Sequence, residues 1–373
     1  MPEEGGGGGK DAGQGERASG RHVPLYSEPM RATTAFATLL LALGATALEA
    51  QWQVIEPGGE TLCADGSAFK FFVYPGDPAK LLVEFEGGGA CWDAATCASS
   101  FYSRRVTLDP AAAEQQGRLV GIYDRKNPEN PFRDWTHVYV PYCTGDLHWG
   151  HNDKTYSAPS GPFTVYHRGA VNAGAAVSWA YENVRAPRQL FVAGCSAGGY
   201  GSALWSAHVM AHYSGASAAQ LSDSGAGVVP PGFFAVPLAN WGAAAAWPNF
   251  IPALSLEHMD PARVTMAEFY TALAGYYPLS AFSEFNRLGD TTQLFFYILT
   301  KNALATQEEW AAQMQASVAS IRSASPNFSS YTAPGSDHCV INNPAVYTTE
   351  VGGVRLVDWI RSLAETRTAP SVP

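Results

Sequence analysis

The sequence predicts an α/β fold, in which a mostly parallel sheet is flanked by helices within a single domain. Short apolar runs alternate with longer segments whose apolar side chains recur at helical spacing, and this alternation is typical of βαβ units. The chain has 373 residues, of which 46% are hydrophobic. It is therefore long enough to bury one large core or two modest ones.

The N-terminal region predicts a leader followed by a secretory signal. Residues 1–29 are polar and rich in glycine, and we expect them to be disordered. Residues 30–47 have a basic start, a short apolar stretch and the small-residue pattern Ala45-Thr46-Ala47, which together indicate a signal peptide. A buried N-terminal helix is the alternative. The sequence thus predicts a secreted or periplasmic protein, with no segment long enough to span a membrane.

The expected elements follow in order along the remaining chain. Predicted strands are Phe69–Tyr74, Leu81–Phe85, Thr136–Val140, Leu190–Ala193, Gln220–Gly225, Leu279–Phe285 and Asn327–Thr332. Predicted helices are Arg168–Asn183, Gly199–Tyr213, Thr265–Tyr276, Thr306–Ile321 and Val354–Leu363. Thr306 and Glu309 have the spacing of a capping box. Pro230–Pro261, rich in proline, tryptophan and alanine, is expected to be an insertion over the active site.

A nucleophile motif lies at the centre of this pattern. Gly194-Cys195-Ser196-Ala197-Gly198 fits G-x-S-x-G and stands between a predicted strand and a predicted helix. That context places a serine hydroxyl on a tight turn at the end of a sheet strand, as in α/β-hydrolases. We therefore expect Ser196 to be a catalytic nucleophile.

A serine hydroxyl needs a histidine to take its proton and a carboxylate to orient that histidine. In α/β-hydrolases these residues follow the serine in the order acid, then histidine. His338 comes just after the last predicted strand and is the preferred base, with His258 as the alternative. Asp290 is favoured as the acid over Asp223, with Asp260 and Asp337 as further competitors.

A glycine-rich loop follows an early strand, at Glu86-Gly87-Gly88-Gly89-Ala90-Cys91. In α/β-hydrolases such a loop supplies backbone N–H groups to the oxyanion hole, together with the residue after the nucleophile. We expect Gly88, Gly89 and Ala197 to be these donors. The alternative is that the glycines only form a tight turn.

The chain contains six cysteines, and an even number behind a signal peptide favours disulfides. Cys91 and Cys97 are close enough in sequence to form a local bridge. A bridge between Cys195 and Cys339 would connect the loops of the expected nucleophile and base. Cys63 and Cys143 would form the remaining pair, and the alternative is buried free thiols.

Substrate contacts are expected from a polar, aromatic loop after the Thr136–Val140 strand. Asp146 and Trp149 could hold a sugar by hydrogen bonding and stacking, together with His148 and His151 of the same loop. Trp92 is expected to contribute as well. A metal site or a solvated loop are the alternatives, although no ligand spacing here is diagnostic. The formal net charge of -10 argues against a nucleic-acid partner.

With these motifs in place, the chain resembles the pectin acetylesterase family, also called the pectinacetylesterase/Notum family. The resemblance rests on the glycine-rich loop, the nucleophile motif, Val140-Pro141-Tyr142-Cys143, Asp223-Ser224-Gly225, Asp290 with Gln293, and His338. It covers essentially the whole of residues 51–366, which we expect to form one α/β-hydrolase-like domain. Members usually carry tryptophan after the glycines, so Ala90 is expected to widen or flatten the pocket.

The resemblance implies a carboxylesterase that needs no cofactor, with Ser196, Asp290 and His338 as its triad. It also implies removal of acetyl groups from carbohydrate esters such as pectin. The alternatives are a feruloyl-, polyester- or lipid-type esterase and, from a different class, an inactive carbohydrate-binding protein on the same fold.

Overall fold

An eight-stranded sheet with the order β1-β2-β4-β3-β7-β8-β9-β10 carries the fold. The computed structural model describes residues 50–260 and 263–373, so the predicted leader and signal peptide lie outside the described residues. Strands β3, β4, β7, β8, β9 and β10 run parallel, and β1 and β2 pair antiparallel at one edge. The prediction of a mostly parallel sheet is confirmed.

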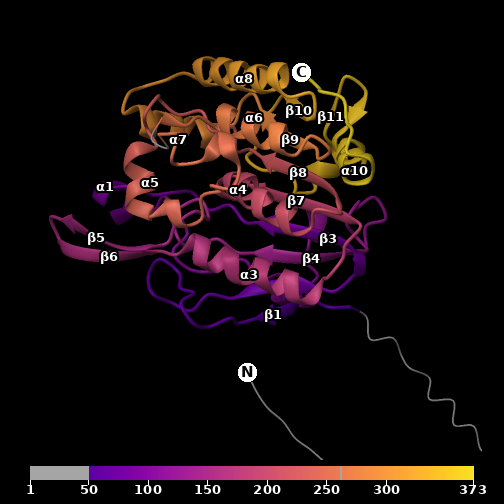
Figure 1. The fold of residues 1–373 in the computed structure, drawn as a ribbon, viewed down its shortest axis with the longest axis horizontal. Helices are drawn as coiled ribbons and strands as arrows, with labels where there is room; N and C mark the ends of the chain where they lie inside the picture. The colour runs from indigo at the N-terminus through magenta and orange to yellow at the C-terminus, as the bar shows by residue number, and fades with distance from the viewer. Residues whose placement is uncertain (1–49, 261–262) are drawn as a thin grey trace, which may run out of the picture. The chain divides into compact units, whose positions relative to one another are not determined.

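The strands of this sheet follow one another from β1 at the bottom of Figure 1 to β10 near the top. Their bounds are β1 Gln53–Ile55, β2 Phe71–Tyr74, β3 Asp77–Phe85, β4 Trp135–Val140, β7 Gln189–Cys195, β8 Ser217–Asp223, β9 Phe282–Arg287 and β10 Phe328–Ala333. Two hairpins stand apart from it, β5 (Asn152–Ala158) with β6 (Gly161–His167) and β11 (Glu350–Val351) with β12 (Val354–Arg355).

The helices lie between and around these strands. The α-helices are α1 Ala94–Ala98, α2 Pro110–Gln115, α3 Gly169–Asn183, α4 Ala197–His212, α5 Ala235–Trp241, α6 Met266–Tyr276, α7 Thr291–Lys301, α8 Gln307–Ala324, α9 Ala345–Thr348 and α10 Leu356–Thr366. Short 3₁₀ turns are η1 Gly121–Tyr123, η2 Ala243–Ala245 and η3 Pro252–Leu254.

Two apolar layers cover the two faces of the sheet. Successive side chains of a strand point to opposite faces, so Leu190 and Val192 of β7 join one buried cluster while Phe191 joins the other. The first cluster includes apolar side chains of α3, α4, α6 and α8. The second includes Trp359 and Ile360 of α10. This burial on both faces explains why the strands read as continuous apolar runs.

One expected cap differs in the structure. The Thr306 hydroxyl accepts a hydrogen bond from the Glu309 N–H, but the Glu309 carboxylate pairs with Lys301 instead of returning to the cap. A reciprocal capping box does occur at α6, where Thr265 and Glu268 exchange both bonds. The prediction at Thr306 was therefore half right, because a nearby cation competes for the Glu309 carboxylate.

Candidate active site

The predicted nucleophile lies on a sharp turn between β7 and α4. Ser196 has φ 55° and ψ -121°, a left-handed conformation that non-glycine residues seldom adopt. Its N–H donates to the Asp223 carbonyl at 2.8 Å. A Cβ on Gly198 would come within 1.9 Å of the Phe85 carbonyl oxygen. The glycine therefore lets β3 approach the turn and hold the serine in its strained conformation.

The structure brings Asp290 and His338 together. Asp290 Oδ2 lies 2.8 Å from His338 Nδ1, and its Oδ1 accepts the N–H groups of Thr292 and Gln293 as the N-cap of α7. Asp290 is fully buried. The carboxylate is therefore fixed by the helix that follows it, with one oxygen presented to the imidazole.

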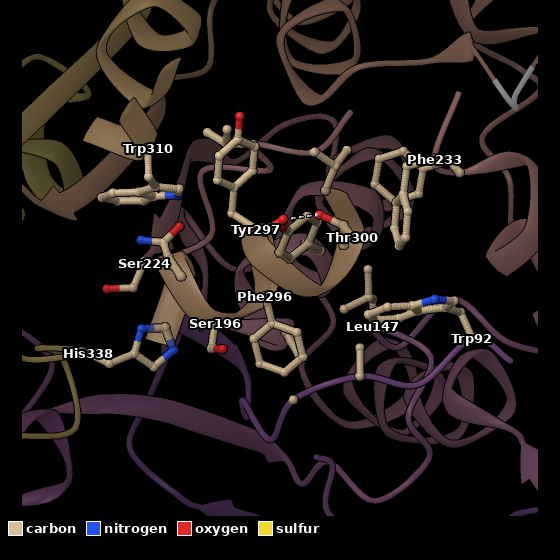
Figure 2. A pocket seen from close by; sticks show the side chains of 18 of the residues that line it. Trp92, Leu147, Ser196, Ser224, Phe233, Phe296, Tyr297, Thr300, Trp310 and His338 are labelled. Carbon is tan, nitrogen blue, oxygen red and sulfur yellow. Dashed lines mark hydrogen bonds between the residues drawn. The ribbon is translucent and has the colours of Figure 1, made fainter. Parts of the chain in front are cut away.

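The other imidazole nitrogen faces the site. Nε2 of His338 is buried and has no hydrogen-bond partner within the described part of the chain. His338 and Ser196 line the same pocket, and Figure 2 shows them next to each other on one side of it. His258, the alternative base, is exposed and does not line this pocket.

Asp223, the alternative acid, has a different set of partners. Its Oδ2 accepts the N–H groups of Val340 and Ile341 at 2.6 and 2.8 Å, and its Oδ1 accepts the Ser224 hydroxyl at 3.0 Å. Burial raises the pKa of Asp223, whereas these donors lower it. Since its backbone carbonyl also holds the Ser196 N–H, Asp223 connects the nucleophile turn to the segment that follows the histidine.

All three expected disulfides are present. Cys195 and Cys339, with Cα atoms 5.7 Å apart, connect the residue before Ser196 to the residue after His338. Cys91 bonds to Cys97 beside the glycine-rich loop. Cys63 and Cys143 form the third bridge. The predicted pairing is confirmed, and no cysteine is free in the described residues.

The glycine-rich loop passes close to the nucleophile. A Cβ on Gly87 would lie 2.6 Å from the Cys195 carbonyl oxygen, and one on Gly89 (φ 79°) would lie 1.9 Å from that of Phe101. Gly89 and Ala197 line the pocket, whereas Gly88 packs against Tyr142 and does not. Ala197 is the first residue of α4, so its N–H has no acceptor within the helix.

Glu86 fixes the start of this loop, a role that the sequence analysis missed. Its Oε2 accepts the Tyr142 N–H at 2.8 Å, and its backbone carbonyl lies 2.9 Å from Nε2 of His148. Burial raises the pKa of Glu86 to about 7, and the bond from Tyr142 lowers it. An acidic residue directly after an apolar strand was the available signal.

The expectation that Asp146 and Trp149 contact substrate needs correction. Asp146 is fully buried, and its carboxylate accepts bonds from the Thr144 hydroxyl and the N–H groups of His148 and Gly169. Trp149 is 1% exposed and donates its indole N–H to the Tyr200 carbonyl. Neither lines the pocket. The loop was expected to reach substrate or solvent, but the polar groups of Asp146 and His148 are used inside the fold, whereas His151 is exposed.

The pocket itself is largely apolar. Its empty space, including the part open to solvent, is about 640 Å³, and Trp92, one of the expected substrate contacts, lies in its wall. Figure 2 shows Phe296 near Ser196, with Phe233 and Trp92 at the far side and Trp310 beyond Ser224. The full lining is Gly89, Ala90, Trp92, Leu147, Ser196, Ala197, Tyr200, Ser224, Val228, Val229, Phe233, Phe234, Trp241, Gln293, Phe296, Tyr297, Thr300, Trp310 and His338.

Comparison with known proteins identifies the family. The pectinacetylesterase family model matches residues 48–229. A palmitoleoyl-protein carboxylesterase, NOTUM of Schmidtea mediterranea, is 35% identical over 92 residues, which are 23% of this chain and 17% of that protein. The crystal structure of the Wnt deacylase Notum from Drosophila (form II) superposes with a TM-score of 0.62 at 19% identity, covering 87% of this chain and 95% of that one. The chain belongs to the pectinacetylesterase/Notum family.

Two further relatives set limits on what this membership implies. The palmitoleoyl-protein carboxylesterase notum2 of Xenopus laevis is 28% identical over 97 residues, 25% of this chain and 20% of that protein. An inactive palmitoleoyl-protein carboxylesterase, notum1b of Danio rerio, is 29% identical over 114 residues, 30% of this chain and 76% of its own length. The aligned stretches thus span a fifth or less of the first two relatives. The family is one of carboxylesterases with inactive members.

The pocket wall contains the residues that sequence reasoning did not single out. Phe296, Tyr297 and Thr300 come from α7, the helix capped by Asp290, and Trp310 comes from α8. Phe233 precedes α5 in the predicted insertion. The only signal was apolar composition, which does not distinguish a pocket wall from a core.

Side chains of the kind that bind metals gather around two of the disulfides. In the described ranges, two clusters of three potential ligands occur, Cys91, Cys97 and His167, and Cys195, His338 and Cys339. Each contains a disulfide, and metal binding by cysteine uses the thiolate. Within the same ranges, no helix has the length and apolar character needed to cross a bilayer.

Proposed function

We propose that the protein is a serine carboxylesterase in which Ser196, His338 and Asp290 form the catalytic triad. The observation that carries this proposal is the orientation of His338. Its Nδ1 is held by the buried Asp290 carboxylate at 2.8 Å, and its Nε2 remains unpartnered among the described residues in the pocket that Ser196 lines. This is the arrangement that general-base activation of a serine requires.

In the first half of the reaction, the Ser196 hydroxyl attacks the ester carbonyl carbon and its proton passes to Nε2 of His338. Asp290 stabilises the imidazolium that forms and keeps the neutral ring in the correct tautomer. The tetrahedral intermediate collapses when the imidazolium protonates the leaving alcohol, and the acyl group stays on Ser196. A water molecule, deprotonated by His338, then attacks the acyl-enzyme and releases the acid.

The developing oxyanion needs backbone donors close to Ser196. We assign this role to the N–H groups of Ala197 and Gly89, with Gly88 as a third donor. Gly89 and Ala197 line the pocket, which supports their assignment more directly than that of Gly88. Preorganised donors of this kind lower the barrier because they need no reorientation when charge develops.

The pocket favours an ester with an apolar acyl group. Its wall contains the side chains of Trp92, Phe233, Phe296 and Trp310, and no Lys, Arg, Asp or Glu of the described ranges lines it. Apolar surfaces of this kind gain free energy from burying an alkyl or aryl chain. Two relatives are palmitoleoyl-protein carboxylesterases, which supports the same class.

Deacetylation of carbohydrate esters such as pectin is the second candidate. The pectinacetylesterase model, which matches residues 48–229, favours it, and Trp92 would offer a sugar a stacking surface. Under either candidate, three disulfides support folding in an oxidising compartment. Secretion through the predicted signal at 30–47 is part of the proposal, as is a single catalytic domain at 51–366.

Hydrolysis of p-nitrophenyl esters from acetate to decanoate, followed by acetylated pectin and xylan, tests both candidates. Ser196→Ala should lower kcat by about 10⁵-fold or more, and Ser320→Ala, at an exposed position of α8, should leave it unchanged. A kcat/KM that rises with acyl length supports the apolar class. A preference for acetate with release from pectin supports the second candidate. Turnover that survives in Ser196→Ala, or absence of turnover on every ester, contradicts the proposal and makes an inactive binding protein the better account.

A further inference from the structure

Helix α7 (Thr291–Lys301) has apolar side chains on two opposite faces. One face, with Gln293, Phe296 and Thr300 at helical spacing, lines the catalytic pocket. The sequence Thr-Thr-Gln-Leu-Phe-Phe-Tyr-Ile-Leu-Thr at 291–300 contains no charged residue. A helix at the surface of a soluble protein usually carries charged residues on its outer face. The outer face of α7 is therefore unusual.

An apolar patch occupies this outer face. Phe295 is 39% exposed and Phe101, from the loop beside Gly89, is 36% exposed. Their rings meet edge to face with centroids 5.1 Å apart. Ile298, three residues further along α7 and half-buried, shares the face of Phe295. We call Phe101, Phe295 and Ile298 the mouth patch.

The mouth patch is continuous with the pocket. The ring of Phe295 contacts that of Phe296 with centroids 5.4 Å apart, and Phe296 lines the pocket beside Ser196 in Figure 2. Exposed aromatic pairs cost free energy in water and are typical of interaction sites. Because this pair borders the pocket of the candidate serine, its partner is expected to be the material that enters the pocket.

We propose that the mouth patch docks the protein onto the uncharged surface of aggregated, water-insoluble ester substrate, from which single acyl groups enter the pocket under α7. This inference rests on the proposed esterase function and specifies the physical state of its substrate. The patch has no charged member, and Lys301 at the end of α7 is paired with Glu309. The formal net charge of -10 disfavours an anionic lipid surface. An uncharged ester droplet is the partner that this chemistry fits.

Hydrolysis of tributyrin below and above its solubility limit tests the docking role. For the unmodified protein, the rate should rise more steeply once droplets form. Phe295→Ser combined with Phe101→Ser should reduce the rate on droplets by about tenfold, as expected from removing two half-exposed rings from an apolar contact. The rate on dissolved tributyrin should change by less than about twofold, since neither side chain lines the pocket.

Leu279→Ser is the matched control. Leu279 is 81% exposed and precedes β9, whereas Asp290 follows it, so Leu279 lies at the opposite edge of the sheet. Its replacement should leave droplet hydrolysis unchanged. Equal losses on dissolved and emulsified tributyrin, or an equal loss in Leu279→Ser, would overturn the docking role. If the double variant does not fold, the single variant Phe295→Ser gives the same comparison.

A binding measurement separates docking from catalysis. Ser196→Ala protein should bind to tributyrin droplets and pellet with them on centrifugation, and adding Phe295→Ser and Phe101→Ser should leave it in the supernatant. This result would support docking even if no ester were hydrolysed, so failure of the esterase proposal remains distinguishable. Ser196→Ala protein that stays in the supernatant when the droplets are pelleted would overturn the inference. A concentration-dependent dimer that Phe295→Ser dissociates would overturn it as well, because a second copy would then be the occupant.

Discussion

The two sides of the pocket are constructed differently. On one side, which we call the catalytic side, Ser196, Asp290 and His338 follow the ends of β7, β9 and β10, and the surrounding polar groups are held by backbone bonds and a disulfide. On the other side, Trp92 and Phe233 form an apolar wall that the insertion partly supplies, and Phe296 of α7 extends this wall toward Ser196. The contrast indicates that catalysis depends on the fixed geometry of the triad. Specificity for the acyl group depends instead on wall side chains that can be substituted without disturbing the triad.

The largest expected effect distinguishes the two buried aspartates on the catalytic side. Asp290→Asn should lower kcat by about 10³–10⁴-fold, because an amide cannot stabilise the imidazolium. Stability should change little, since asparagine is also a good N-cap. Asp223→Asn should instead destabilise the fold by about 2–4 kcal/mol, because its oxygens accept three donors. Steady-state kinetics and urea unfolding measure both, with the exposed Asp337→Asn as control.

The opposite pattern would change the assignment. If Asp223→Asn abolished turnover without loss of stability while Asp290→Asn remained active, Asp223 would be the catalytic acid and Asp290 would have only a structural role.

The disulfide of the catalytic side is the next test. Replacing Cys195 and Cys339 together by serine should lower the free energy of unfolding by about 3–5 kcal/mol, because a long loop is no longer closed in the unfolded chain. At a temperature where the variant stays folded, kcat should also fall. The bridge holds Cys339, the residue after His338, in a left-handed conformation (φ 65°), and its loss should let His338 move. Thermal unfolding and kinetics at 15–25 °C read the two effects separately. Replacing Cys63 and Cys143 is the control, which should lower stability alone.

A pH measurement tests the support of the glycine-rich loop. Burial raises the pKa of Glu86 to about 7 from its ordinary value of 4.5, so its contribution to stability is full below pH 4.5 and is lost as the pH rises through 7. Glu86→Gln keeps the acceptor for the Tyr142 N–H but cannot ionise. The decrease in the free energy of unfolding between low and high pH should therefore be smaller in the variant, by up to about 3 kcal/mol. Urea unfolding at pH 5 and pH 8 checks it. If the free energy of unfolding of the unmodified protein and of Glu86→Gln depended equally on pH, the ionised Glu86 carboxylate would not be destabilised by burial.

The smallest expected effect concerns the apolar wall. Phe296→Ala should lower kcat/KM for a medium-length apolar acyl ester by about tenfold and leave that for acetate within about threefold, because only a longer chain contacts the ring. Phe250→Ala, at a 42% exposed ring that does not line the pocket, is the control. A loss shared by all esters would place Phe296 on the catalytic side of the comparison.

Much of the catalytic side could be anticipated because its residues are specified by local pattern. The G-x-S-x-G turn needs glycine at position 198, where a Cβ would meet Phe85. The residues around Ser196 therefore identify it as the candidate nucleophile. Asp290 could be preferred over Asp223 because the sequence predicts it in the loop between a strand and a helix. In the structure it is the N-cap of α7. The cysteines adjacent to Ser196 and His338 predicted their own pairing, which the structure confirms.

The loop at Asp146 and Trp149 shows where this reasoning ends. Polar and aromatic residues after a strand resemble a ligand-binding loop, but whether they face a ligand or each other depends on distant segments. Here Gly169 donates to Asp146 and Tyr200 accepts from Trp149, and neither partner is close in sequence. The same limit concealed the hairpin β5–β6 and the role of Glu86, whose carboxylate holds a residue of another strand's loop.

The sequence by itself determined the fold class, the family, the cysteine pairing and the expected nucleophile and base, because each depends on a residue type at a fixed position relative to a strand end. For the acid it gave only a preference for Asp290. Only the tertiary structure decided which carboxylate reaches His338, which aromatic residues face the pocket rather than the core, and that α7 carries apolar side chains on both faces. These features depend on which distant surfaces pack together. Hydrophobic burial is non-directional, so composition alone cannot assign a side chain to a pocket wall.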